Sequence, residues 1–377
     1  MATVVFPLRQ DFVNLRSVLC RQHRTSSETR LFRCVAERAM GRTKIKEYTW
    51  KVANESLRRE ESSLPVPAFQ QLPQHSSTLS SKHVCVRPDI MMAATKEVVV
   101  PKLRYLSAWF CPYAHRATIA LEHHAGRINY EWIEALGWEQ RSSNETGTGK
   151  EWWYHWKADE LKRTNTSALV PTLIPVDVVT GKPNEEKSVY ESLLAVEYID
   201  AIANPLDECH RLLPTDPHLA WKCRYWADKL NKECCSPYYG VLVRTDEKEQ
   251  LENFDKLVLG LKAFSREIER NGDGRGFLGD GRLSSVDVSV MPWAYRYYIF
   301  EHYRGFTIPL DDPELHAYEE WYDYVFNTDS VKRTLPDRDR YLEHIGKYAD
   351  ASARSKVANA VRRGVAAHEI EDLKDTY

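Results

Sequence analysis

The sequence predicts a small α/β domain followed by an all-helical domain, with a long irregular extension in front of both. Strand patterns alternate with helical patterns between residues 97 and 207, and beyond Pro214 only helical patterns occur. Residues 1–96 show neither the helical nor the strand pattern of apolar residues. They are rich in Ser, Gln, Pro and Arg, which is typical of a disordered segment. The 377 residues suffice for two domains of about 150 residues with appendages.

The α/β domain is expected to begin with a strand, a helix and a second strand. Residues 98–109 are β-branched and aromatic, which favours a strand. Apolar residues recur at helical spacing through 112–121, and Gly126 ends this helix. Residues 128–132 alternate apolar and polar side chains, as a half-buried strand does. The stretch 137–166 predicts a helix and an insertion.

Two short strands and a helix complete the predicted domain. The strands are expected at residues 169–176 and 188–190, separated by the turn sequence Thr-Gly-Lys-Pro at 180–183. A helix follows at 192–203. The predicted order is therefore βαβ, then α, then ββα.

The helical domain is expected over residues 214–345. Its clearest helix covers 286–302, and Ser284 lies three residues before Asp287, which is the spacing of a capping box. Further helices are expected at 219–233, 247–270 and 313–326. Residues 346–377 form a tail that is predicted to be helical or disordered.

Charge and composition limit where the protein is expected and what it is expected to bind. The formal charge of −2 argues against a nucleic-acid binder, and no apolar run approaches the roughly 18 residues of a membrane span. We therefore expect a cytoplasmic protein. Residues 1–46, however, carry ten Lys and Arg against three acids, as mitochondrial and plastid transit peptides do. The alternative is an extension without function, because Met91 would be a natural start.

The eight cysteines predict neither a disulfide scaffold nor a metal centre. They include no Cys-x-x-Cys pair and no Cys/His cluster at zinc spacing. A reducing compartment fits this usage best, and we expect no bound metal.

Cys111 is the strongest candidate for a reactive side chain. It follows a predicted strand, and Pro112 occupies a first helical position, where its missing N–H is tolerated. The sulfur would then face the positive end of a helix, with His115 and Arg116 one turn further on. These features favour a thiolate at neutral pH. Ala114 stands where a second cysteine would resolve a disulfide, so an external thiol is required, and glutathione is the obvious one.

Two further motifs predict a binding site beside this cysteine. A cis bond between Val170 and Pro171, just before a buried strand, would turn the backbone of Val170 toward a ligand. Glu191 and Ser192 stand at a helix start, where N–H groups and a hydroxyl hold a carboxylate and an acid holds an ammonium group. An α-amino acid carries both charges. Taken alone, Ser192 would be a plain N-cap.

These motifs, in this order, resemble the cytosolic glutathione S-transferases over about residues 100–345. The sequence Trp-Phe-Cys-Pro-Tyr-Ala-His-Arg at 109–116 resembles the omega class, and further stretches resemble its fungal members. The resemblance implies a thioredoxin-like domain at 97–207, the all-helical transferase domain behind it, and a homodimer. It also implies a catalytic cysteine rather than the tyrosine or serine of other classes.

The resemblance assigns a role to each candidate residue. It implies that Cys111 is catalytic and forms the mixed disulfide with glutathione. The residues implied to bind glutathione are Lys150, Val170, Pro171, Glu191 and Ser192. Lys150 is matched least well, because the loops on both sides of Pro171 are longer than in the family. Trp293 and Tyr297 match the acceptor site, but both equally fit a helix core.

The expected function is glutathione-dependent thiol transfer and reduction of mixed disulfides or of acceptors such as dehydroascorbate. Glutathione acts as co-substrate, and small electrophilic or disulfide compounds are the expected partners. One alternative is a glutathionyl-hydroquinone reductase, whose family shares a similar Cys-Pro-x-Ala-x-Arg motif. Another is a binding module on the same scaffold without catalysis, against which an intact reactive cysteine counts.

Overall fold

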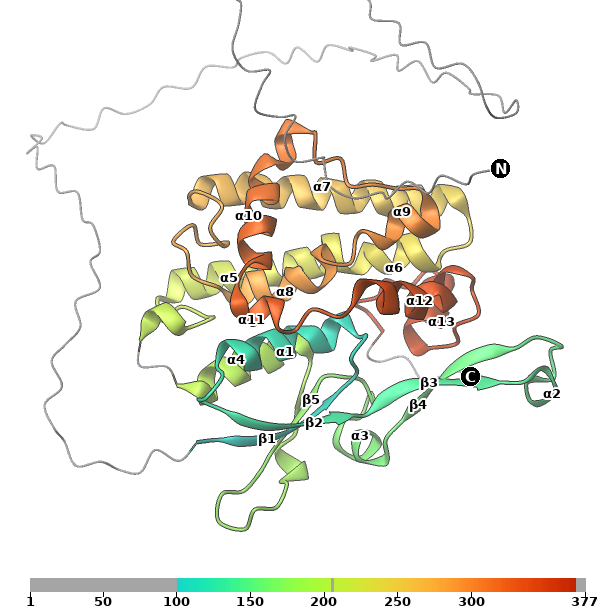
Figure 1. Ribbon diagram of the computed structural model, residues 1–377, viewed down its shortest axis with the longest axis horizontal. Coiled ribbons are helices and arrows are strands. Elements are labelled where there is room, and N and C mark those ends of the chain that lie inside the picture. The colour runs from blue at the N-terminus through green and yellow to red at the C-terminus, as the bar shows by residue number, and fades with distance from the viewer. Residues whose placement is uncertain (1–99, 205–206, 371–377) are drawn as a thin grey trace, which may run out of the picture. The chain divides into compact units, whose positions relative to one another are not determined.

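The computed structural model describes residues 100–204 and 207–370. The extension 1–96, with its possible transit peptide, lies outside the described residues. The described chain forms a mixed β-sheet with helices, followed by a helical domain, so the predicted fold class is confirmed (Figure 1).

A four-stranded sheet forms the base of the first domain. Its strands are β1 (Lys102–Ser107), β2 (Asn129–Glu134), β5 (Thr172–Pro175) and β6 (Val189–Tyr190), in the order β2-β1-β5-β6. β1 pairs with β2 in parallel, whereas the other two pairs are antiparallel. Two helices, α1 (Pro112–His123) and α4 (Ser192–Ala203), lie between this sheet and the helical domain (Figure 1). The site therefore forms where α1 and α4 meet that domain.

The stretch 137–166, for which the sequence predicts a helix and an insertion, contains a β-hairpin as the insertion and a short helix after it. β3 (Leu136–Arg141) and β4 (Trp152–Lys157) pair antiparallel, and the short α2 (Ser143–Thr146) closes the tip. β4 reads Trp-Trp-Tyr-His-Trp-Lys, and such aromatic runs pack on a pleated surface better than around a helix. The hairpin extends beyond the sheet, and α3 (Asp159–Thr164) follows it (Figure 1).

The second domain consists of helices throughout its described part. They are joined by turns and longer loops, and a π-helical turn at Asn231–Cys235 links the first two. The helices are α5 (Pro217–Leu230), α6 (Ser236–Val243), α7 (Glu247–Asn271), α8 (Ser285–Ala294), α9 (Ile299–Arg304), α10 (His316–Phe326), α11 (Asp329–Lys332), α12 (Arg338–Ala349) and α13 (Lys356–Arg362). None of the helices within residues 100–370 is both long and apolar enough to cross a bilayer.

The helix predicted over 286–302 is interrupted. It begins with the expected capping box between Ser284 and Asp287, but α8 ends at Ala294 and α9 begins only at Ile299. Pro292 lies inside α8, and it lacks the N–H that would bond one turn back. After α8 the chain forms a turn over residues 295–298, and α9 begins beyond it.

The C-terminal tail is ordered and packed over its described part. The N–H of Trp153 in β4 donates to the carbonyl of Ser352 at 3.1 Å, and the N–H of Arg354 donates to the carbonyl of Trp153 at 2.7 Å. The guanidinium of Arg354 also lies 3.4 Å from the ring centre of Trp152. We call this junction of residues 152–153 with 352–354 the hairpin–tail clamp. It joins the two segments whose structure was least predictable.

Candidate functional site

Cys111 occupies the N-cap of α1, as the sequence predicts. Its φ of −78° and ψ of 118° are extended, Pro112 follows at the first helical position, and the carbonyl of Cys111 accepts the first helical bond from the N–H of His115 at 3.0 Å. Cys111 forms no disulfide, and the residue as a whole is partly exposed. A lone cysteine therefore stands at a helix start.

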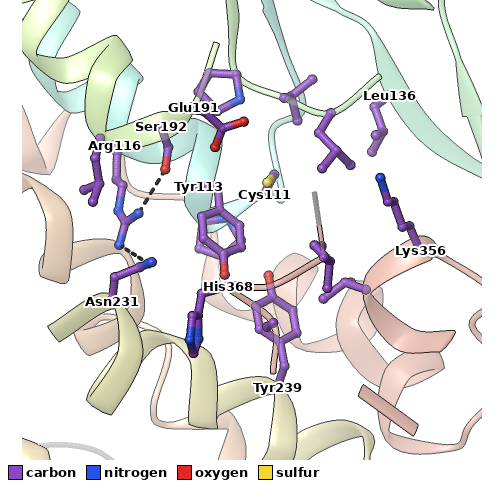
Figure 2. A pocket seen from close by; sticks show the side chains of 18 of the residues that line it. Cys111, Tyr113, Arg116, Leu136, Glu191, Ser192, Asn231, Tyr239, Lys356 and His368 are labelled. Atoms are coloured by element: carbon purple, nitrogen blue, oxygen red, sulfur yellow. Dashed lines mark hydrogen bonds between the residues drawn. The ribbon is translucent and has the colours of Figure 1, made fainter. Parts of the chain in front are cut away.

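The thiol opens into a cavity of about 380 Å³ between the sheet domain and the helical domain. Figure 2 shows Cys111 in its middle. The cavity brings together five of the predicted site residues: Cys111, Val170, Pro171, Glu191 and Ser192. Aromatic rings of the helical domain face them, among them Tyr239, Tyr341 and Tyr348.

The charge state of Cys111 differs from our expectation. Burial raises the pKa of its thiol above the ordinary value, although the N–H groups of Ala114 and Tyr113 and the charges of Arg296 and Arg116 act to lower that pKa. The prediction of a thiol that is mostly ionised at neutral pH is therefore corrected. The sequence shows the helix start, but it does not show how deeply the surrounding rings enclose the sulfur.

His115 does not supply the positive charge that the motif suggested. Burial and the neighbouring Arg296 hold its pKa well below the ordinary value, so the ring is neutral. The Nη1 of Arg296 donates to Nδ1 of His115 at 3.1 Å, which leaves the ring proton on Nε2 to bond Thr334 Oγ1 at 2.8 Å. The positive charges that act on the Cys111 sulfur are therefore those of Arg296, from the turn after α8, and of Arg116.

Arg116 ties the two domains together beside the site. Its buried guanidinium donates to Ser192 Oγ at 2.9 Å, to Asn231 Oδ1 at 3.0 Å and to the carbonyl of Ser289 at 2.8 Å. It also lies 4.4 Å from the ring centre of Trp293. Sequence reasoning gave Arg116 only an electrostatic role toward Cys111, whereas the structure makes it the residue that fixes the hydroxyl of Ser192.

The backbone adopts unusual conformations at the other two predicted motifs, Val170–Pro171 and Glu191–Ser192. The bond between Val170 and Pro171 is cis, as the sequence motif required. Glu191 precedes α4 with a φ of +69°, a region that residues other than glycine seldom occupy. Strained residues of this kind concentrate at binding and catalytic sites. Both motifs thus hold their backbone toward the cavity next to Cys111.

Three predicted residues lie away from the cavity wall. Lys150 is exposed near the tip of the hairpin, with its ammonium 5.8 Å from the ring centre of Trp152. Trp293 is fully buried behind Arg116. Tyr297 is buried too, and its hydroxyl donates to the carbonyl of Cys234 at 3.3 Å. The longer stretch before Pro171 folds into the hairpin, which carries Lys150 outward.

Several residues at the cavity come from segments that sequence reasoning left open. The hairpin contributes Leu136 and His155, and the C-terminal tail contributes Lys356, Val357, Ala367, His368 and Ile370. No local motif marks them, because their place at the cavity depends on how distant segments pack together. Within residues 100–370, no group of three or more His, Cys, Asp or Glu side chains is arranged to hold a metal ion.

Comparison with known proteins identifies relatives of one kind. No protein-family model matches the chain. Glutathione S-transferase U27 of Arabidopsis thaliana is 29% identical over 245 residues, which cover 64% of this chain and 89% of that protein. The probable glutathione S-transferase parC of Nicotiana tabacum is 28% identical over 200 residues, covering 52% of this chain and 84% of that protein.

Solved structures share the fold at low sequence identity. Rice GST1, solved in complex with glutathione, has a TM-score of 0.51 at 23% identity and covers 67% of this chain and 98% of its own. The tau-class enzyme of mango, Mangifera indica, has a TM-score of 0.51 at 22% identity and covers 66% of this chain and 98% of its own. Glutathione transferase Omega 1C of Trametes versicolor has a TM-score of 0.50 at 16% identity and covers 67% of this chain and 98% of its own. Solved structures named as tau and as omega transferases thus share this architecture.

Proposed function

Because the chain is related in sequence and fold to the glutathione S-transferase family, we propose that it is a glutathione transferase of the omega type that acts through Cys111. The observation that carries the proposal is a single free thiol at the N-cap of α1, in one cavity with the cis bond before Pro171 and with Glu191 and Ser192. The relatives support glutathione as co-substrate, and the cysteine supports thiol transfer over simple conjugation. We place the reaction in the cytoplasm, where glutathione is kept reduced.

The proposed cycle consists of two thiol–disulfide exchanges. The thiolate of Cys111 attacks the glutathione sulfur of a mixed disulfide, so that a Cys111–glutathione disulfide forms and the substrate leaves as a thiolate. The thiolate of a second glutathione then attacks the sulfur of the bound glutathione. Glutathione disulfide leaves, and Cys111 is released. The electrons come from glutathione alone, so the cycle needs no further reductant.

In this cycle the surrounding residues bind and orient. The backbone of Val170 pairs with the cysteinyl part of glutathione, and Glu191 with the start of α4 holds its γ-glutamyl end. Arg116 fixes the hydroxyl of Ser192 in the direction that this end requires. The N–H groups of Tyr113 and Ala114 stabilise the negative sulfur of Cys111.

Replacing Cys111 tests the proposal. In the Cys111→Ala variant we expect glutathione-dependent reduction of 2-hydroxyethyl disulfide to fall at least about a hundredfold, because no side chain replaces the nucleophile. The matched control is Cys209→Ala, since Cys209 is a second cysteine outside any disulfide and is more exposed. The proposal fails if Cys111→Ala, folded as judged by circular dichroism, keeps its activity, or if Cys209→Ala loses it.

The aromatic lining favours glutathionyl hydroquinones as a second substrate class. Phe110, Tyr113, Tyr239, Tyr341 and Tyr348 line the cavity, and flat rings pack well against such walls. The Cys111 thiolate would attack the glutathione sulfur, break its bond to the ring carbon and release the hydroquinone after that carbon takes a proton. A rate with a glutathionyl hydroquinone far above that with the disulfide would assign the protein to this reaction.

A further inference from the structure

A buried arginine of the helical domain lies beside the start of α1. Arg296, in the turn after α8, has a fully buried side chain. Its Nη1 donates to Nδ1 of His115 at 3.1 Å and to the carbonyl of Pro292 at 2.6 Å, and its guanidinium lies 4.6 Å from the ring centre of Tyr341. These contacts place it near the nucleophile, because His115 follows Cys111 by one turn of α1 and Tyr341 lines the same cavity as Cys111.

The positive charge of Arg296 has no acidic partner among residues 100–204 and 207–370. In this part of the chain, neither its Nε nor its Nη2 has a hydrogen-bond partner, and its Nη1 binds only a neutral ring and a carbonyl. An arginine stays protonated even when it is buried, and a buried charge without an opposite charge is unfavourable. A negative charge that forms nearby is therefore stabilised by this guanidinium.

The ionisable groups packed around Arg296 are themselves uncharged. His115, from α1, is neutral because its pKa lies well below the ordinary value. The others are four tyrosines, from α6, from α12 and from the turn that contains Arg296: Tyr238, Tyr341, Tyr295 and Tyr298. Burial raises the pKa of each of these tyrosines, so they carry no charge near neutral pH. Cys111 is the group in these surroundings that ionises most readily.

Arg116, the other arginine that acts on Cys111, is already bound by neutral acceptors. Its guanidinium donates to oxygens of Ser192, Asn231 and Ser289. Such acceptors turn the negative ends of their dipoles toward the cation and weaken its field at the sulfur. Both arginines act to lower the pKa of the Cys111 thiol, and Arg296 has the larger effect.

The remaining ionisable groups near Cys111 are tyrosines and two residues of the cavity wall. They are Tyr105, Tyr239, Tyr341 and Tyr348, together with Glu191 and Lys356.

We infer that Arg296 is the counter-charge for the thiolate of Cys111. It is a positioning residue, because it does not line the cavity and acts by stabilising the negative form of the nucleophile. His115 holds the guanidinium in place as a neutral acceptor, and its other ring nitrogen is fixed by Thr334 at 2.8 Å. The inference rests on the proposed function, which takes Cys111 as the nucleophile, but its tests need no glutathione.

The first test gives Cys111 a fixed negative charge in the wild type. Iodoacetate converts the cysteine to its carboxymethyl form, and iodoacetamide converts it to the carbamidomethyl form, which has nearly the same size and no charge. We expect the carboxymethyl protein to unfold about 2–4 °C higher, because its carboxylate supplies an opposite charge for Arg296. Cys111→Ala treated with the same two reagents is the matched control, and its two products should unfold at the same temperature.

The second test removes the charge of Arg296. Arg296→Gln keeps a hydrogen-bond donor, and it should slow the alkylation of Cys111 by iodoacetamide about three- to tenfold at each pH between 7 and 8.5. This is the effect of raising the pKa of the thiol by about 0.5 to 1. Arg296→Lys keeps the charge and should retain most of the rate. Peptide mass spectrometry follows Cys111 and, as an internal reference that should not change, Cys209.

The matched control for this variant is Arg304→Gln. Arg304, in α9, is a half-buried arginine whose guanidinium donates to the carbonyls of Val241, Tyr303 and Ala349. Its replacement removes a charge of the same kind at another place in the helical domain, so the alkylation rate of Cys111 should stay at that of the wild type.

Three results would overturn the inference. The first is a carboxymethyl protein that is no more stable than the carbamidomethyl protein, and the second is a folded Arg296→Gln that alkylates at the rate of the wild type. The third is an equal loss of rate in Arg304→Gln, since the effect would then be structural. If Arg296→Gln does not fold, the two adducts of the wild type decide alone. The proposed function is decided separately, by the disulfide reduction activity of Cys111→Ala.

Discussion

Asp287 offers the sharpest test of how the helix beneath the site is held. Its fully buried carboxylate accepts four hydrogen bonds: from the N–H of Ser284 at 2.7 Å, the hydroxyl of Ser284 at 2.6 Å, the N–H of Phe277 at 2.8 Å and the indole N–H of Trp321 at 2.6 Å. Asp287→Ala leaves these donors without that acceptor, and each buried donor left unpaired costs about 1–3 kcal/mol. The two N–H groups and the indole alone give a loss of at least about 3 kcal/mol.

The assay is urea unfolding followed by tryptophan fluorescence. We expect the midpoint to fall for Asp287→Ala and to fall about half as far for Asp287→Asn, because the amide keeps one accepting oxygen. Ser284→Ala is the matched control, since it removes one donor of the same cap and should cost about 1 kcal/mol. A loss below about 1 kcal/mol in Asp287→Ala would refute the reasoning.

The remaining predictions concern pH. Because burial raises the pKa of the Cys111 thiol, its alkylation by iodoacetamide should speed up about tenfold per pH unit between pH 7 and 8.5, and a plateau below pH 7.5 would contradict this. Burial also lowers the pKa of His155 and of His344 to about 3, whereas the unfolded chain binds these protons near pH 6.5. The contribution of these two histidines to the free energy of unfolding should therefore be constant above about pH 6.5 and fall between pH 6.5 and 3, by up to about 1.4 kcal/mol per pH unit and histidine. Denaturation series of the wild type and of a variant with both histidines changed to Gln measure this, and equal slopes would contradict the assignment.

Features set by neighbouring residues were the most predictable from sequence. The capping box of Ser284 and Asp287 needs only a spacing of three, and the N-cap position of Cys111 needs only a strand end followed by Pro112. The cis bond before Pro171 likewise belongs to a local motif. In each case the interacting groups lie within one helical turn or one peptide unit, so the sequence contains the whole interaction.

Features that depend on contacts between distant segments were missed. The guanidinium of Arg116 reaches Ser192 and Asn231, 76 and 115 residues away. His124 is buried against Asp200, which also accepts the N–H of Leu212 at 2.8 Å. Neither position carries a local signal, because the burial of a polar side chain is decided by what packs on it. The same holds for the pKa of Cys111, which depends on the enclosing rings.

The hairpin–tail clamp has a consequence for biosynthesis. The cis bond, Cys111 and the start of α4 leave the ribosome long before Lys356 and Ile370, which complete the wall of the same cavity. The cavity around Cys111 therefore lacks part of its wall until the last helices have been translated and residues 352–354 have paired with β4. Its final shape is set by the last part of the described chain to be synthesised.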